Sequence, residues 1–273
     1  MTEVVEPDFP IHVGRCIYCP PDAVGSIDGL SDEHVIPEGF NGIWVLEKAS
    51  CKTHRDVTSA FEGRVLGNGL GHVRRKLNFR TKHRKRRRDT LDVAYHVGDE
   101  RRKCTVPVSE HPGSFAFPVF GAPSCLGPGE PSGELRVERV SGRWHAPSVK
   151  KMAIQFGATA LGVPLVDSVS MAQMIAKIGY GFAVACFGLD AFETVYVLPT
   201  IVDKGRNAGR YVGCLSDPPM NEQAEGHQVT LVQRGRDLTC YIRLVAQMAI
   251  PEYVVVVGRL REMLPAESTG NAA

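Results

Sequence analysis

The 273-residue sequence has no apolar run long enough to span a membrane: the longest lies near Ile178–Leu189, and Lys177 precedes it. Its first residues are acidic and poor in apolar side chains, so we expect no signal peptide. It also lacks an internal repeat and a glycine-rich phosphate loop, which excludes repeat proteins and P-loop nucleotide binders. We therefore expect a cytoplasmic protein that makes no use of a membrane, with 43% hydrophobic residues to build a sizeable core.

Four soft metal ligands stand in two pairs near the N-terminus. Cys16 and Cys19 are separated by two residues in a tight turn, and Cys51 and His54 have the same spacing at the start of an expected helix, with Ser50 as its N-cap. Residues at i and i+3 share a helix face, so three thiolates and one imidazole can close a tetrahedral zinc site. Four protein ligands leave no open position, and this zinc would be structural. The alternative is a redox-active cysteine pair beside two unrelated residues.

Between the two pairs lies the segment Glu33-His34-Val35-Ile36-Pro37. The order of cysteine pair, acidic-His-x-x-Pro segment and second pair resembles the HNH endonuclease family, the zinc-bearing branch of the ββα-metal nucleases, over roughly residues 12–67. The resemblance implies a metal-dependent endonuclease that hydrolyses phosphodiester bonds in DNA. It makes His34 the general base that activates water, and Glu33 a ligand of a catalytic Mg²⁺ or Mn²⁺. The alternative is a surface Glu-His pair before a turn.

One position departs from the family pattern. Members of the family usually carry Asn after the last zinc ligand, whereas this chain has Arg55, which cannot bind a cation. Asp56 or Glu62 could supply the missing metal ligand, or Arg55 could pair with the scissile phosphate. A different class of function is then a zinc-stabilised nucleic-acid-binding module with weak or no cleavage. A third is a protein-interaction domain in which the zinc is only a scaffold.

The net charge of +2 hides a concentrated basic segment. Residues 74–88 hold ten of the 32 Lys and Arg and no acid, so the rest of the chain has 22 basic and 30 acidic residues, a net charge of −8. Such a segment beside an HNH-like motif favours contact with the phosphate backbone of nucleic acid, and we expect double-stranded DNA. The alternative is a solvated linker. The expected contacts are Arg74, Arg75, Lys76, Arg80, Lys82, Arg84, Lys85, Arg86, Arg87 and Arg88.

The expected fold class is α+β: an N-terminal ββα-metal HNH module with structural zinc, followed by a separate α+β domain. The expected divisions are an N-terminal extension (1–11), the module (12–70), the basic segment (71–90), the α+β domain (91–262) and a disordered tail (263–273). Helical spacing predicts helices over 148–161 and 168–189. Alternation and turn signals predict strands over 91–97, 103–108, 195–198, 228–233, 238–246 and 253–257, a hairpin over 135–145, and a Gly/Pro-rich loop over 112–133.

Overall fold

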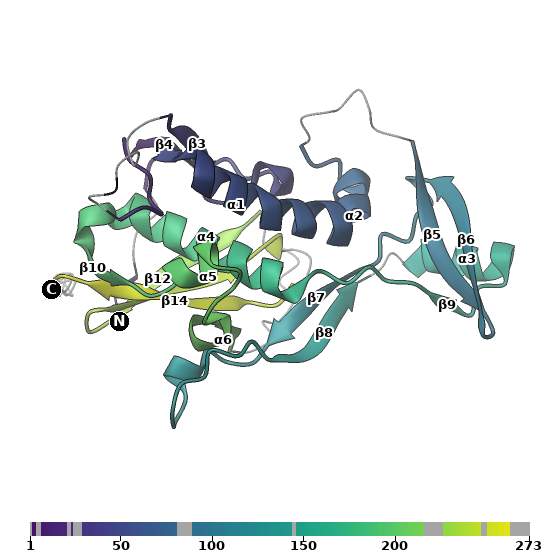
Figure 1. The fold of residues 1–273 in the computed structure, drawn as a ribbon. Coiled ribbons are helices and arrows are strands. Elements are labelled where there is room, and N and C mark those ends of the chain that lie inside the picture. Colours follow the sequence, from purple (N-terminus) through teal and green to yellow (C-terminus); the bar gives the residue numbers. More distant parts are fainter. Residues whose placement is uncertain are drawn as a thin grey trace, which may run out of the picture.

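The computed structural model describes residues 2–3, 7–20, 23, 29–80, 89–143, 146–215, 226–246 and 250–262. These residues form a mixed α+β structure, which confirms the expected fold class at that level (Figure 1). The expected tail, 263–273, lies outside the described residues.

The N-terminal part contains two antiparallel strands followed directly by a helix. The strands are β3 (Ser31–His34) and β4 (Val45–Ser50), with the short β2 (Ile11–His12) parallel to β4 on its other side. A 3₁₀ turn, η1 (Glu38–Phe40), connects β3 to β4. After β4 the chain enters α1 (Lys52–Gly63), then the π-helical turn η2 (Arg64–Gly69) and α2 (Gly71–Lys76).

The largest sheet is antiparallel and comes from the C-terminal half together with the first residues of the chain. Its strand order is β1-β12-β13-β14-β10, and β11 also pairs with β14. The strands are β1 (Thr2–Glu3), β10 (Phe192–Val195), β11 (Val212–Cys214), β12 (Gln228–Arg234), β13 (Asp237–Arg243) and β14 (Tyr253–Leu260). The predictions of β12, β13 and β14 are confirmed within a few residues at each end.

Helix α4 (Ser168–Phe187) lies between this sheet and α1 (Figure 1). The Asp167 carboxylate caps its start by accepting a hydrogen bond from the Ser170 amide at 2.8 Å. By length and composition α4 could cross a membrane, but 83% of its apolar window is buried inside the protein, which is typical of a core helix. One continuous hydrophobic core joins Phe61 of α1, Ile178 of α4 and Val255 of β14. The packing therefore runs across the expected boundary at residues 71–90.

A smaller lobe carries its own apolar cluster, with Val93, Val106 and Met152 among its buried members. It consists of β5 (Thr90–Val97), β6 (Glu100–Pro107), α3 (Ala146–Phe156) and β9 (Ala160–Leu161), and the two-stranded pair of β7 (Phe115–Phe120) and β8 (Val137–Arg143) connects it to the main body (Figure 1). The remaining short elements are η4 (Ser124–Leu126), η5 (Leu189–Ala191), α5 (Leu198–Val202) and α6 (Ala208–Tyr211).

Four predictions of secondary structure are wrong. The helix expected over 148–161 ends at Phe156, and Ala160–Leu161 forms strand β9. The expected loop 112–133 contains β7, and all six residues of this strand are buried. Burial therefore favoured a strand here, although the surrounding sequence is rich in Gly and Pro. The expected hairpin over 135–145 is instead one strand, β8, which pairs with β7 in a register that places Phe120 opposite Val137. The strand expected at 195–198 ends at Val195, and Leu198 begins α5 with Pro199 in its first turn.

Candidate metal centre and adjoining cavity

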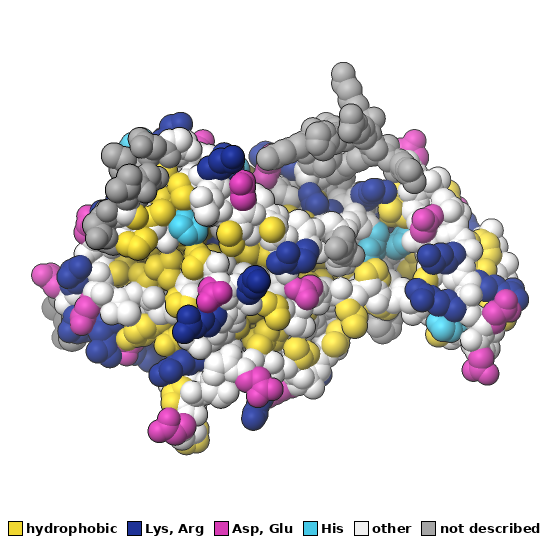
Figure 2. All heavy atoms as spheres, viewed as in Figure 1, with side chains coloured by type: hydrophobic (Ala, Val, Ile, Leu, Met, Phe, Trp, Pro, Cys, Tyr) yellow, Lys and Arg dark blue, Asp and Glu magenta, His cyan; other side chains and the backbone are white. Residues whose placement is uncertain are grey.

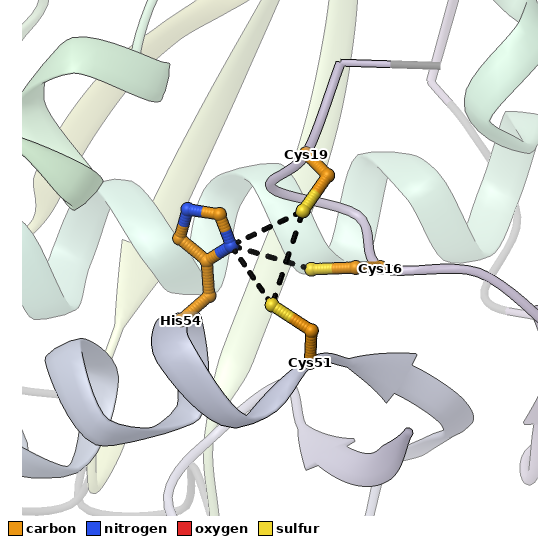
Figure 3. A group of neighbouring side chains, drawn as sticks. All are labelled: Cys16, Cys19, Cys51 and His54. Carbon is orange, nitrogen blue, oxygen red and sulfur yellow. Dashed lines mark hydrogen bonds between the residues drawn. The ribbon is translucent and has the colours of Figure 1, made fainter. Parts of the chain in front are cut away.

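Cys16, Cys19, Cys51 and His54 converge as predicted and could hold a metal ion (Figure 3). The Nδ1 atom of His54 lies 3.5, 3.4 and 3.3 Å from the sulfurs of Cys16, Cys19 and Cys51, and the sulfurs of Cys19 and Cys51 are 3.8 Å apart. A tetrahedral zinc with ordinary bond lengths requires nitrogen–sulfur edges of about 3.6 Å and sulfur–sulfur edges of about 3.8 Å. The four residues therefore fit a structural zinc ion.

The protonation state of these ligands would change when a divalent ion binds. Burial raises the pKa of the Cys16 thiol and, together with the nearby Cys16, raises the pKa of Cys19 to about 12. Burial also lowers the pKa of His54. A coordinated divalent ion would lower the pKa of the Cys16 and Cys19 thiols, since a coordinating thiol is deprotonated outright. Metal binding would therefore release protons from this cluster.

Backbone contacts fix both halves of the cluster. The turn that carries Cys16 is held by a hydrogen bond from the Ile17 amide to the Ala49 carbonyl at 2.8 Å, and the Tyr180 hydroxyl of α4 donates to the Ile17 carbonyl at 2.6 Å. Cys51 itself is the N-cap of α1, with extended backbone angles. The prediction of Ser50 as N-cap is wrong, because Ser50 is the buried last residue of β4.

A cavity of about 480 Å³ lies between the end of β3 and helix α1. Its walls come from the end of β3, from η1, from α1 and from the segment that follows α2. Its polar and charged lining includes Glu33, His34, Arg55, Glu62, Arg80 and Lys177. The pairing of β3 with β4 is irregular between Ser31 and Glu33, and β3 ends at His34.

The structure brings four of the five expected catalytic residues to this one cavity: Glu33, His34, Arg55 and Glu62. Asp56 points elsewhere; its side chain is 64% exposed and lies 3.7 Å from the Arg55 guanidinium. Of the two carboxylates that were candidates for completing the site, Glu62 is therefore the one that lies beside Glu33 and His34.

Lys177 of α4 is the residue that sequence reasoning missed. Its ammonium lies 2.7 Å from a carboxylate oxygen of Glu33 and 2.6 Å from one of Glu62, and it also donates to the His34 carbonyl. The Lys177 side chain is only 1% exposed. Burial alone would lower the pKa of Lys177, but the two carboxylates outweigh it and raise that pKa to about 12. Lys177 is the one charged residue between Ser168 and Phe187, and such a lone charge in an apolar helix signals a buried partner.

These contacts decide how well a catalytic divalent metal fits. Glu33 and Glu62 line the cavity together with His34, and both already bind the ammonium of Lys177. Asp32 and Glu38 line the cavity as well. Arg55 stands where the resemblance implies a neutral ligand, and it adds a positive charge. Glu33 and Glu62, the carboxylates expected to bind the metal, therefore do not fit the Mg²⁺ or Mn²⁺ that the resemblance implies while Lys177 holds them.

In the described part of the basic segment, some side chains bind backbone carbonyls of the protein and others are partly or fully exposed. The Arg74 guanidinium donates to the carbonyls of Gly39, Arg80 and Leu66 at 2.6, 3.0 and 3.3 Å. The Lys76 ammonium donates to the His111 carbonyl, and burial lowers its pKa. Arg75 is half-buried and Arg80 is exposed at the cavity. The other expected contacts, Lys82, Arg84, Lys85, Arg86, Arg87 and Arg88, lie outside the described residues.

Figure 2 shows Lys and Arg side chains interspersed with Asp and Glu on the face that it presents. Of the basic segment, Arg74 and Arg80 line the cavity.

Comparison with known protein families, characterised proteins and solved structures finds no match.

Proposed function

We propose that the chain is an endonuclease of the HNH type that hydrolyses phosphodiester bonds in DNA, with the zinc cluster as its scaffold. The observation that carries this proposal is the convergence of His34, Glu33 and Arg55 on one cavity, with Arg55 next in the chain after His54 of the metal-binding cluster. The order of β3, β4 and α1 around that cavity supports the resemblance seen in the sequence.

The cavity offers the groups that hydrolysis of a phosphodiester requires. In this proposal the His34 imidazole accepts a proton from the attacking water. The water oxygen bonds to phosphorus as the bond from phosphorus to the leaving sugar oxygen breaks, and that oxygen takes up a proton from solvent. Arg55 and Arg80 at the cavity pair with the non-bridging phosphate oxygens, whose negative charge increases as the water attacks. Glu33 and Glu62 both bind the Lys177 ammonium and are thereby fixed in place in the site. The basic segment, which contributes Arg74 and Arg80 to the cavity, would position double-stranded DNA without reading its sequence.

Nicking of a supercoiled plasmid tests the proposal. Zinc-loaded protein should convert the plasmid to the open-circular form, and His34→Ala should remove at least 99% of that rate, because a positioned general base contributes about 10²–10⁴-fold. His12→Ala is the matched control, since His12 lies on β2 in the same part of the chain and its side chain is 68% exposed beside Glu47. Equal nicking by wild type and His34→Ala would refute the assignment.

The second candidate is a zinc-stabilised nucleic-acid-binding module, and Arg55 in place of Asn favours it. Such a module would bind DNA with a steep salt dependence and would cut it weakly or not at all. If five basic side chains contact phosphates, a log–log plot of the binding constant against salt should have a slope of about −4 to −5. Binding with this slope, unchanged in His34→Ala and without nicking by the wild type, would select the module over the nuclease.

A further inference from the structure

The Lys177 ammonium is surrounded by oxygen atoms, as a bound cation would be. An ammonium has three N–H donors, and here three oxygens accept from it: one of Glu33, one of Glu62 and the His34 carbonyl. All the donors of the group are thereby used inside the protein. Its acceptors come from β3 and α1, whereas Lys177 itself is 143 residues from His34 in the sequence.

The position of this ammonium is fixed by the packing of α4. On one side of Lys177, the Gln173 amide donates to the Ile201 carbonyl at 3.0 Å, and on the other, Tyr180 donates to Ile17. A Cβ atom at Gly179 would lie 3.1 Å from the Cβ of Val255, so the helix approaches the sheet closely there. With the helix anchored on both sides of Lys177, its side chain cannot withdraw without disturbing the core.

A divalent ion at the same carboxylates would meet this positive charge directly. The ammonium lies within 2.7 Å of both Glu33 and Glu62, so a metal bound to either would sit a few ångströms from a like charge in a buried site. Repulsion between such charges is large where water is excluded. Lys177 and a divalent metal are therefore alternatives at this position.

We propose that Lys177 takes the place of the catalytic metal in this site, so that the chain acts on its phosphodiester substrate without a divalent cofactor. Lys177 is a positioning residue: it orders the carboxylates of Glu33 and Glu62 and the backbone of His34, while Arg55 and Arg80 meet the phosphate. This inference rests on the proposed nuclease function for its meaning in catalysis. Its central claim, that the two carboxylates bind an ammonium instead of a metal, can be tested without any cleavage.

The binding test uses Mn²⁺ alone as the probe, followed by electron paramagnetic resonance on the zinc-loaded full chain. Wild type and Glu62→Gln should bind Mn²⁺ equally weakly. Lys177→Met, which leaves both carboxylates, should gain one site at least 100-fold tighter, and adding Glu62→Gln to it should remove that site. A wild-type site that weakens in Glu62→Gln would overturn the inference, even if Lys177→Met fails to fold. A folded Lys177→Met that gains no site would overturn it as well.

The cleavage test asks whether nicking needs a divalent metal. Wild-type nicking should change less than twofold when Mg²⁺ is omitted and a chelator is added at a concentration that metal analysis shows to leave the zinc in place. Lys177→Met should nick only when Mg²⁺ or Mn²⁺ is present. A wild-type rate that falls tenfold or more without Mg²⁺ would overturn the inference and leave the nuclease proposal standing. Absence of nicking under every condition would refute the nuclease proposal, while Mn²⁺ binding would still decide the role of Lys177.

Discussion

Replacing Lys177 by Met should destabilise the whole protein strongly, because it removes the ammonium that pairs with both Glu33 and Glu62. In the folded state the pKa of Lys177 is raised from 10.5 to about 12. The site therefore favours the charged form of Lys177. The substitution leaves Glu33 and Glu62 without that partner, and breaking a buried ion pair by removing one member costs about 3–5 kcal/mol.

Thermal unfolding of zinc-loaded protein at pH 7, followed by calorimetry, measures this loss. At about 2–4 °C per kcal/mol for a chain of this size, the melting temperature should fall by about 6–20 °C. Lys150→Met on the exposed side of α3 is the matched control and should change stability by less than about 0.5 kcal/mol. A triple variant, Lys177→Met with Glu33→Gln and Glu62→Gln, should recover at least half of the loss, because it removes the buried negative charges.

The contribution of Lys177 to the free energy of unfolding should decrease at high pH. Because the folded-state pKa of Lys177 lies above its ordinary value, its contribution is fully present below pH 10.5 and is lost as the pH rises through 12. The difference in stability between wild type and Lys177→Met should therefore narrow over that interval. A loss below about 1 kcal/mol at pH 7, or a triple variant no more stable than the single one, would refute the view that these charges depend on one another.

Three further predictions concern the metal cluster and a tight turn. Cys51→Ser should abolish tight zinc binding and lower the unfolding temperature of the whole chain in calorimetry, because one core joins the cluster to the C-terminal sheet; an unchanged main transition would contradict this. His54→Cys should keep its zinc in metal analysis, since a fourth thiolate also closes the tetrahedron. Gly42→Ala should destabilise by more than about 3 kcal/mol in urea unfolding, because its Cβ would lie 1.9 Å from the Ile36 carbonyl oxygen. The control Gly63→Ala on α1 has open space and should be neutral or slightly stabilising, and equal effects would contradict the steric argument.

The features that the sequence predicted correctly are those set by local spacing. Cys16 and Cys19 lie in one turn, and Cys51 and His54 lie in the first turn of one helix, so only the two pairs had to be brought together. The approximate limits of α4 followed from its periodic apolar face, whereas the cap by Asp167 was seen only in the structure. By contrast, β7 was missed because its strand character comes from burial and from pairing with β8, and neither can be read from the glycines and prolines around it.

The candidate site was predicted only as far as its residues lie close together in the chain. Glu33, His34, Arg55 and Glu62 fall within 30 positions of one another, and the ββα order is enough to gather them. Lys177 enters from a helix more than 110 residues beyond Glu62, and no motif marks it. The sequence does signal that it needs a partner, since a lone ammonium in a buried helix must be compensated. Identifying that partner required the packing of α4 on α1, the same contact that makes this site a joint product of the N-terminal motif and the C-terminal core.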